Sequence, residues 1–143
     1  MAAEMSADPT RQDPISGPTV HVRYMVDDVE RALDFYTTHF GFTAGTVALP
    51  AFADAVRGHL RLLLSGPRSS AGRPMPDGDL PGPGGWNRIH LVVDDLAREV
   101  ARLRGGGVAF RNDVVTGPGG SQILVQDPAG NLVELFQPAA AGG

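Results

Sequence analysis

Two stretches of this chain share one arrangement of apolar and polar positions. Residues 20–29 alternate apolar and polar side chains and end on Val-Asp-Asp-Val, and residues 88–96 follow the same pattern and end on Val-Asp-Asp-Leu. Alternation predicts a β-strand with one buried face, and the aspartate pair before a new apolar residue is typical of a helix start. We therefore expect an internal repeat whose unit opens with a strand and a helix.

The second part of each opening is a helical pattern. Asp28 and Asp95 stand at the expected N-caps, and glycine follows each predicted helix, at Gly41 and at 105–107. Apolar residues fall at the spacing of one helix face in both repeats. They are Val29, Ala32, Leu33, Tyr36 and Phe40 in the first, and Leu96, Val100 and Leu103 in the second.

Further strands are predicted behind each helix. They lie near 42–48 and 60–65 in the first repeat, and near 108–111, 121–126 and 132–137 in the second. Asp-Pro-Ala-Gly-Asn at 127–131 is typical of a tight turn between the last two strands. Each repeat is thus a strand, a helix and two or three more strands, over 18–66 and 86–138.

Glycine and proline concentrate outside these repeats. The chain has 19 glycines and 12 prolines, and they crowd the stretch 67–85, which predicts either a linker between the repeats or a lid over a binding site. Residues 1–17 are small, polar and aperiodic and are expected to form a disordered tail. Residues 139–143 form a second short tail.

Composition narrows the functional classes. The 143 residues are 42% hydrophobic and 20% charged, as in one compact domain or two half-size ones. A net charge of -4 argues against nucleic acid or an anionic membrane as partner. The absence of cysteine excludes disulfides and thiolate chemistry. Without a transmembrane run or a signal peptide, a soluble cytoplasmic protein is expected.

Strand alternation also predicts which side chains could meet a ligand. If the helices cover one face of each sheet, residues pointing to the other face can line a binding cup. The candidates are His21, Arg23 and Met25 in the first repeat, and Trp86, Arg88, His90, Val92, Phe110, Leu132, Glu134 and Phe136 in the second.

Two motifs resemble those of a known superfamily. Val-Asp-Asp-Val, five residues and Phe-Tyr at 26–36, with Phe-Gly-Phe at 40–42, are similar to the start of a vicinal oxygen chelate module, and 127–137 is similar to its end. Glyoxalases, bleomycin-resistance proteins and extradiol dioxygenases make up this superfamily. The resemblance covers 18–138. It implies an α+β fold of two tandem βαβββ modules that form a curled, cup-shaped mixed sheet with helices on the outer face, commonly in a homodimer.

The resemblance implies a metal site that this chain matches only in part. Enzymes of the superfamily hold a divalent metal with His or Gln on a first strand and Glu on a last strand, and the metal polarises a substrate oxygen. His21 and Glu134 match these ligands for Zn, Ni, Mn or Fe. Arg88 stands where the second histidine belongs, and arginine has no lone pair to offer. Arg61 is the nearest equivalent of the missing first-module carboxylate, and His90 is displaced by about 7 Å along its strand.

These departures favour an electrostatic set in place of a metal. Arg88 is expected to pair with Glu134, with His21 beside them, either to orient a ligand or as a plain salt bridge inside the cup. Trp86 either stacks on an aromatic ligand or packs a strand end onto the core. His39 and His59 are expected at the surface.

Three functions stay open, so whether the chain is an enzyme is undecided. We favour a metal-independent small-molecule-binding protein that holds a hydrophobic or aromatic compound in antibiotic-sequestering style. The second is a metal-dependent lyase, isomerase, epimerase or dioxygenase using His21 and Glu134. The third is a metal-independent enzyme with Glu134 or His21 as general base and Arg88 stabilising an oxyanion. The expected partners are a small molecule and a second copy of the chain.

Overall fold

The computed structural model describes residues 17–140. The predicted tails at 1–17 and 139–143 therefore lie largely outside the described residues. Twelve elements follow in chain order: β1 (Val20–Met25), α1 (Val29–His39), β2 (Thr43–Ala48), β3 (Phe52–Arg57), β4 (Leu60–Ser65), the 3-10 helix η2 (Ser70–Gly72), β5 (Arg88–Val92), α2 (Leu96–Gly105), β6 (Ala109–Phe110), β7 (Val115–Gly117), β8 (Gly120–Gln126) and β9 (Leu132–Pro138).

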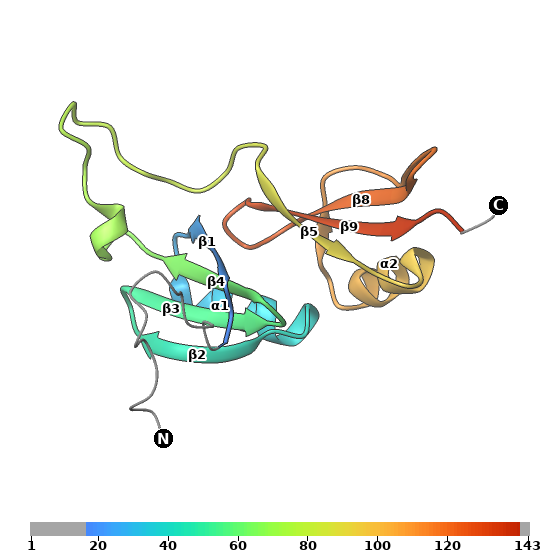
Figure 1. Ribbon diagram of the computed structural model, residues 1–143. Helices are drawn as coiled ribbons and strands as arrows, with labels where there is room; N and C mark the ends of the chain where they lie inside the picture. Colours follow the sequence, from blue (N-terminus) through green and yellow to red (C-terminus); the bar gives the residue numbers. More distant parts are fainter. Residues whose placement is uncertain (1–16, 141–143) are drawn as a thin grey trace, which may run out of the picture.

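The strands form two mixed sheets of the same topology (Figure 1). The first sheet has the order β1-β4-β3-β2, with β1 parallel to β4 and the other pairs antiparallel. The second has the order β5-β9-β8-β6, with β5 parallel to β9 and β7 paired to β8. This confirms the predicted α+β fold of two βαβββ units, but within residues 17–140 the two sheets do not close into a barrel.

Two strands of the structure are absent from the sequence prediction. β3 lies in Phe-Ala-Asp-Ala-Val-Arg, whose alanines and aspartate have low strand propensity. Ala53 and Ala55 are nevertheless fully buried under α1, where small side chains let the helix approach the sheet. The three-residue β7 joins β8 through an exposed turn. Tertiary packing, which the local pattern does not report, decides both strands.

Both helices begin at the predicted caps. The Asp28 carboxylate accepts the backbone N–H of Arg31 at 3.1 Å, and the Asp95 carboxylate accepts that of Arg98 at 3.1 Å. Each bond satisfies one of the free N–H groups of a first helical turn. Within residues 17–140, neither helix is long and apolar enough to cross a membrane.

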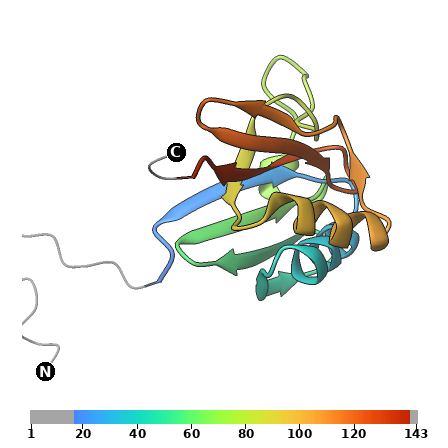
Figure 2. The same cartoon turned by 90° about the vertical axis from the view of Figure 1, so that its right-hand side faces the viewer.

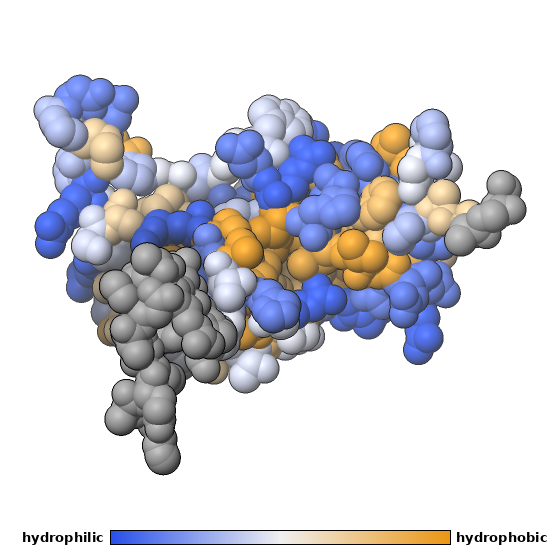
Figure 3. All heavy atoms as spheres, viewed as in Figure 1, coloured by the Kyte–Doolittle hydropathy of each residue, from blue (hydrophilic) through white to orange (hydrophobic). Residues whose placement is uncertain are grey.

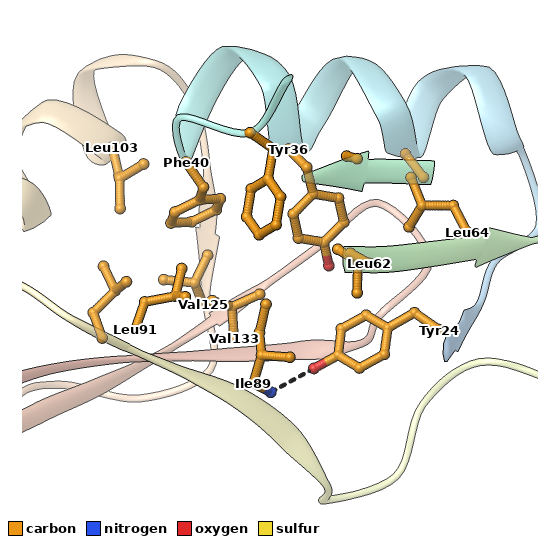
Figure 4. Packing of buried hydrophobic residues seen from close by; sticks show 14 of the residues in the cluster. Tyr24, Tyr36, Phe40, Leu62, Leu64, Ile89, Leu91, Leu103, Val125 and Val133 are labelled. Atoms are coloured by element: carbon orange, nitrogen blue, oxygen red, sulfur yellow. Dashed lines mark hydrogen bonds between the residues drawn. The ribbon is translucent and has the colours of Figure 1, made fainter. Parts of the chain in front are cut away.

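One core runs through both units. The helices α1 and α2 lie side by side and cover the same side of the molecule (Figure 2). Beneath them, Tyr36 of α1, the C-cap residue Phe40 and Leu103 of α2 pack with side chains of both sheets (Figure 4). Because one continuous apolar cluster joins the two units, they share a single core and are not independent domains.

Two polar side chains reinforce this junction. The Tyr24 hydroxyl donates to the Leu132 carbonyl at 2.6 Å and accepts the Ile89 N–H at 2.8 Å. The Asn131 amide donates to the Met25 carbonyl and accepts the Gly84 N–H, each at 2.8 Å. Burial raises the pKa of Tyr24 to about 12. The edges of the two sheets are therefore held in a fixed register.

Candidate functional site

Each sheet has an inner face, defined here as the face opposite the helices. On β1 it carries His21, Arg23 and Met25, since Val22, Tyr24 and Val26 pack toward the helices. On the second sheet it carries Arg88, His90 and Val92 of β5, and Leu132, Glu134 and Phe136 of β9. The alternation predicted from sequence therefore holds on these strands.

Glu134 is the centre of the polar cluster on the second sheet. Its Oε1 lies 3.0 Å from Nε and 3.0 Å from Nη2 of Arg88, and its Oε2 lies 3.2 Å from Nε2 of His90. Only 9% of its side chain is exposed. His90 stands directly opposite Glu134 in the register, and its ring lies 4.9 Å from that of Phe136. Both carboxylate oxygens are thus engaged by basic side chains, in a partly apolar setting.

Trp86 borders this cluster. The Arg88 guanidinium donates to its carbonyl at 3.2 Å, and the Arg111 guanidinium lies 5.4 Å above its ring. The side chain is 64% exposed and lies outside the core cluster. The interpretation that Trp86 packs a strand end onto the core is therefore wrong. Its indole ring instead leaves aromatic surface accessible beside Arg88.

The registers also correct the proposed equivalence of the two units. His21 lies opposite Arg61, as Arg88 lies opposite Leu132. Glu134, two residues beyond Leu132, therefore corresponds to Leu63, and not to Arg61 as the sequence suggested. The first unit places a leucine where the second places its carboxylate.

His21 and Glu134 do not meet as the two metal ligands that the resemblance implied. His21 is exposed on the first sheet, beside Arg61 and Asp54, and it is not among the contacts of Glu134. His90 takes the place beside Glu134 that was expected for His21. Within residues 17–140, no three His, Cys, Asp or Glu side chains come together as a metal-binding group. Since a guanidinium already holds Glu134, these residues do not fit a divalent metal.

Sequence reasoning missed a second ion pair. Asp54 of β3 is 1% exposed, and its carboxylate accepts from Nε of Arg61 at 3.0 Å and also from Nη2. It accepts the Thr46 N–H at 3.0 Å as well. An aspartate between alanines gave no strand signal, so its position opposite Leu63 became visible only in the folded sheet.

Some predicted wall residues lie elsewhere. Phe110 is wrong as an inner-face residue, because it pairs with Val125 and packs against the helix-side core, with the Arg104 guanidinium 5.3 Å from its ring. Val92 is exposed on the inner face, whereas Leu132 is buried.

His59 is exposed as predicted. His39 is half-buried at the end of α1, where burial and then Arg102 lower its pKa.

The surface combines these features. In Figure 3, hydrophobic residues gather in a band across the middle of the molecule and are flanked by hydrophilic ones. The exposed large apolar side chains include Trp86, Val92, Val114 and Val115 of the second unit. An exposed apolar surface with polar groups at its edge is a common feature of small-molecule and protein binding surfaces.

Comparison with known proteins shows which proteins this chain is similar to. The search of curated protein sequences finds no match. Among solved structures, the chain is similar to a lactoylglutathione lyase from Agrobacterium tumefaciens (22% identity, 87% of this chain and 95% of that chain, TM-score 0.68). It is also similar to a glyoxalase/bleomycin resistance protein/dioxygenase superfamily member from Sphaerobacter thermophilus DSM 20745 (27%, 86% and 98%, 0.68). A third is TnmS3, an antibiotic binding protein from Streptomyces sp. CB03234 (26%, 88% and 100%, 0.65).

The family model described as Glyoxalase/Bleomycin resistance protein/Dioxygenase superfamily matches residues 19–135, from the start of the first unit nearly to the end of the second. This range contains the first βαβββ unit, most of the second, and Arg88, His90 and Glu134. The chain therefore belongs to the Glyoxalase/Bleomycin resistance protein/Dioxygenase superfamily.

Proposed function

We propose that this protein binds a hydrophobic or aromatic small molecule without a metal, in the manner of an antibiotic-sequestering protein. The observation that carries the proposal is the double engagement of Glu134 by Arg88 and His90. A carboxylate that holds an arginine is a poor metal ligand, but the pair is a stable source of hydrogen-bond donors in an apolar setting.

The neighbouring side chains support an aromatic ligand. The Phe136 ring lies 4.9 Å from the His90 ring and is tilted against it, and Trp86 and Val92 of the same unit are largely exposed. Aromatic faces and a few placed polar groups are the usual lining of small-molecule sites. The similarity to an antibiotic binding protein at 26% identity points the same way.

A second copy of the chain belongs to the proposal. Within residues 17–140 the two sheets do not close on each other, and each inner face carries exposed side chains, among them His21 and Val92. We propose that a homodimer brings an inner face of one protomer opposite that of its partner, so that the ligand is enclosed. A monomer by light scattering at micromolar concentration, with and without ligand, contradicts this part. A cytoplasmic location stays a prediction.

Trp86 provides the direct test of binding, because it is the single tryptophan of the chain. Titration with aromatic antibiotics and uncharged polycyclic compounds should quench or shift its fluorescence and raise the melting temperature. Replacing Val92 with aspartate on the same face should weaken binding, whereas the exposed helix substitution Ala101→Asp should not.

Metal content separates this function from a metal-dependent lyase, isomerase or dioxygenase. The purified protein should contain no stoichiometric metal, and incubation with Zn, Ni, Mn or Fe(II) should leave ligand binding unchanged. A bound metal that is lost in both His21→Ala and Glu134→Ala contradicts the proposal and supports the metalloenzyme.

A further inference from the structure

A separate cavity of about 500 Å³ lies on the inner face of the first sheet, away from the Glu134 cluster. Pro18 and Val56 form apolar parts of its wall, and His21 and Arg61 form polar parts. His21 and Arg61 are direct neighbours on β1 and β4. The cavity thus joins apolar surface with two nitrogen-bearing side chains.

The Asp54–Arg61 pair beside this cavity is held by contacts from several strands. Asp54 is almost fully buried and uses one oxygen for the Thr46 N–H and the other for Arg61. A Cβ at position 45 would overlap the Asp54 carboxylate, so any residue other than glycine would push that carboxylate or the strand aside. Three strands therefore contribute to holding one guanidinium in place.

Stability alone is a weak reason for such a pair. Replacing a buried ion pair with apolar side chains of similar size is often neutral or stabilising. What the pair does provide is a fixed orientation for Arg61, whose Nε and Nη2 both point to Asp54. The side chain is 34% exposed, and within residues 17–140 no acceptor occupies its Nη1. Because Arg61 lines the cavity, this nitrogen is available to a ligand there.

The charge around Arg61 determines which kind of acceptor its Nη1 can bind. The Asp54 carboxylate compensates the guanidinium and would repel a second anion placed nearby. A neutral oxygen meets no such repulsion and still gains a hydrogen bond from a charged donor. We infer that the Arg61 cavity binds the carbonyl oxygen of an uncharged aromatic ligand. This inference rests on the proposed small-molecule function and adds, on the first sheet, a second site for the same class of ligand.

Two uncharged naphthalene probes test it. Prodan carries a ketone, whereas N-phenyl-1-naphthylamine carries no oxygen, and the fluorescence of both responds to an apolar site. Replacing Arg61 with methionine should weaken Prodan binding about tenfold, which is the effect of losing one hydrogen bond from a charged donor. Binding of N-phenyl-1-naphthylamine should change by less than about twofold. Arg98→Met, on the exposed side of α2, is the matched control and should change neither.

Because Arg61→Met leaves a buried carboxylate unpaired, the same comparison is made between Asp54→Asn and Asp54→Asn/Arg61→Met. Equal weakening of both probes, or no change for Prodan, overturns the inference and leaves the proposed function standing. Tighter, Arg61-dependent binding of anilinonaphthalene sulfonate, the sulfonated form of the oxygen-free probe, overturns the ligand class, because it shows an anion site. If the protein binds none of these probes and no compound in the Trp86 titration, the proposed function fails, and this inference fails with it.

Discussion

The hydroxyl oxygen of Tyr24 lies 2.8 Å from the backbone nitrogen of Ile89 and joins β1 of the first unit to β5 of the second (Figure 4). The same hydroxyl donates to Leu132 on β9. One buried side chain thus satisfies two backbone groups at the junction of the sheets. Since the ring also packs in the shared core, Tyr24 couples the stability of both units.

Tyr24→Phe should lower the free energy of unfolding by about 2 kcal/mol, because it leaves a buried N–H and a buried C=O without this partner. The shape of the ring is kept, so the loss measures the hydrogen bonds. Urea unfolding followed by circular dichroism tests this. A loss below about 0.5 kcal/mol means that the junction rests on apolar packing alone.

The Arg88–Glu134 pair should behave as a coupled unit. Arg88→Met leaves Glu134 buried with His90 alone and should cost about 1–3 kcal/mol of unfolding free energy. The double variant Arg88→Met/Glu134→Met should recover much of that loss, because no unpaired carboxylate is left in the sheet. A double-mutant cycle from urea unfolding measures the coupling. Additive losses contradict the pairing as an energetic unit.

Gly45 should be intolerant of even one added carbon. Gly45→Ala places a Cβ against the Asp54 carboxylate, and overpacking of this kind costs about 1–3 kcal/mol. Gly117→Ala is the matched control, since open space surrounds that position. Thermal unfolding of the two variants decides the matter. A melting temperature for Gly45→Ala equal to that of the control contradicts the close approach of β2 and Asp54.

His39 should make stability depend on pH. Burial and the Arg102 charge lower its pKa, so the unfolded chain binds the proton more tightly than the folded one. Neutral His39 therefore contributes fully to the free energy of unfolding at pH 7.5. This contribution is lost as the pH drops below the ordinary histidine pKa of about 6.5. His39→Gln should reduce the difference in melting temperature between pH 7.5 and 5.5. His59→Gln, at an exposed site, should leave that difference unchanged.

Local pattern was enough to predict both helices and the first strand of each unit. Helix spacing, N-cap aspartates and alternation are properties of a few consecutive residues, and packing did not override them at Asp28, Asp95 or along β1. β3 was missed because its alanines have low strand propensity and are favoured there only by packing against α1. Phe110 was assigned to the wrong face because its short strand is too brief for alternation to be reliable.

The sequence by itself determined the repeat and the family, because both depend on motifs. It also led us to expect the Arg88–Glu134 pair, since the resemblance places these residues at the metal-ligand positions of the second module. Only the tertiary structure decided the other contacts across strands. It placed His90 rather than His21 beside Glu134, and it put Leu63 at the corresponding position of the first unit. It also brought Asp54 to Arg61. Contacts of this kind follow from sheet register and from the packing of α1, which no single segment encodes.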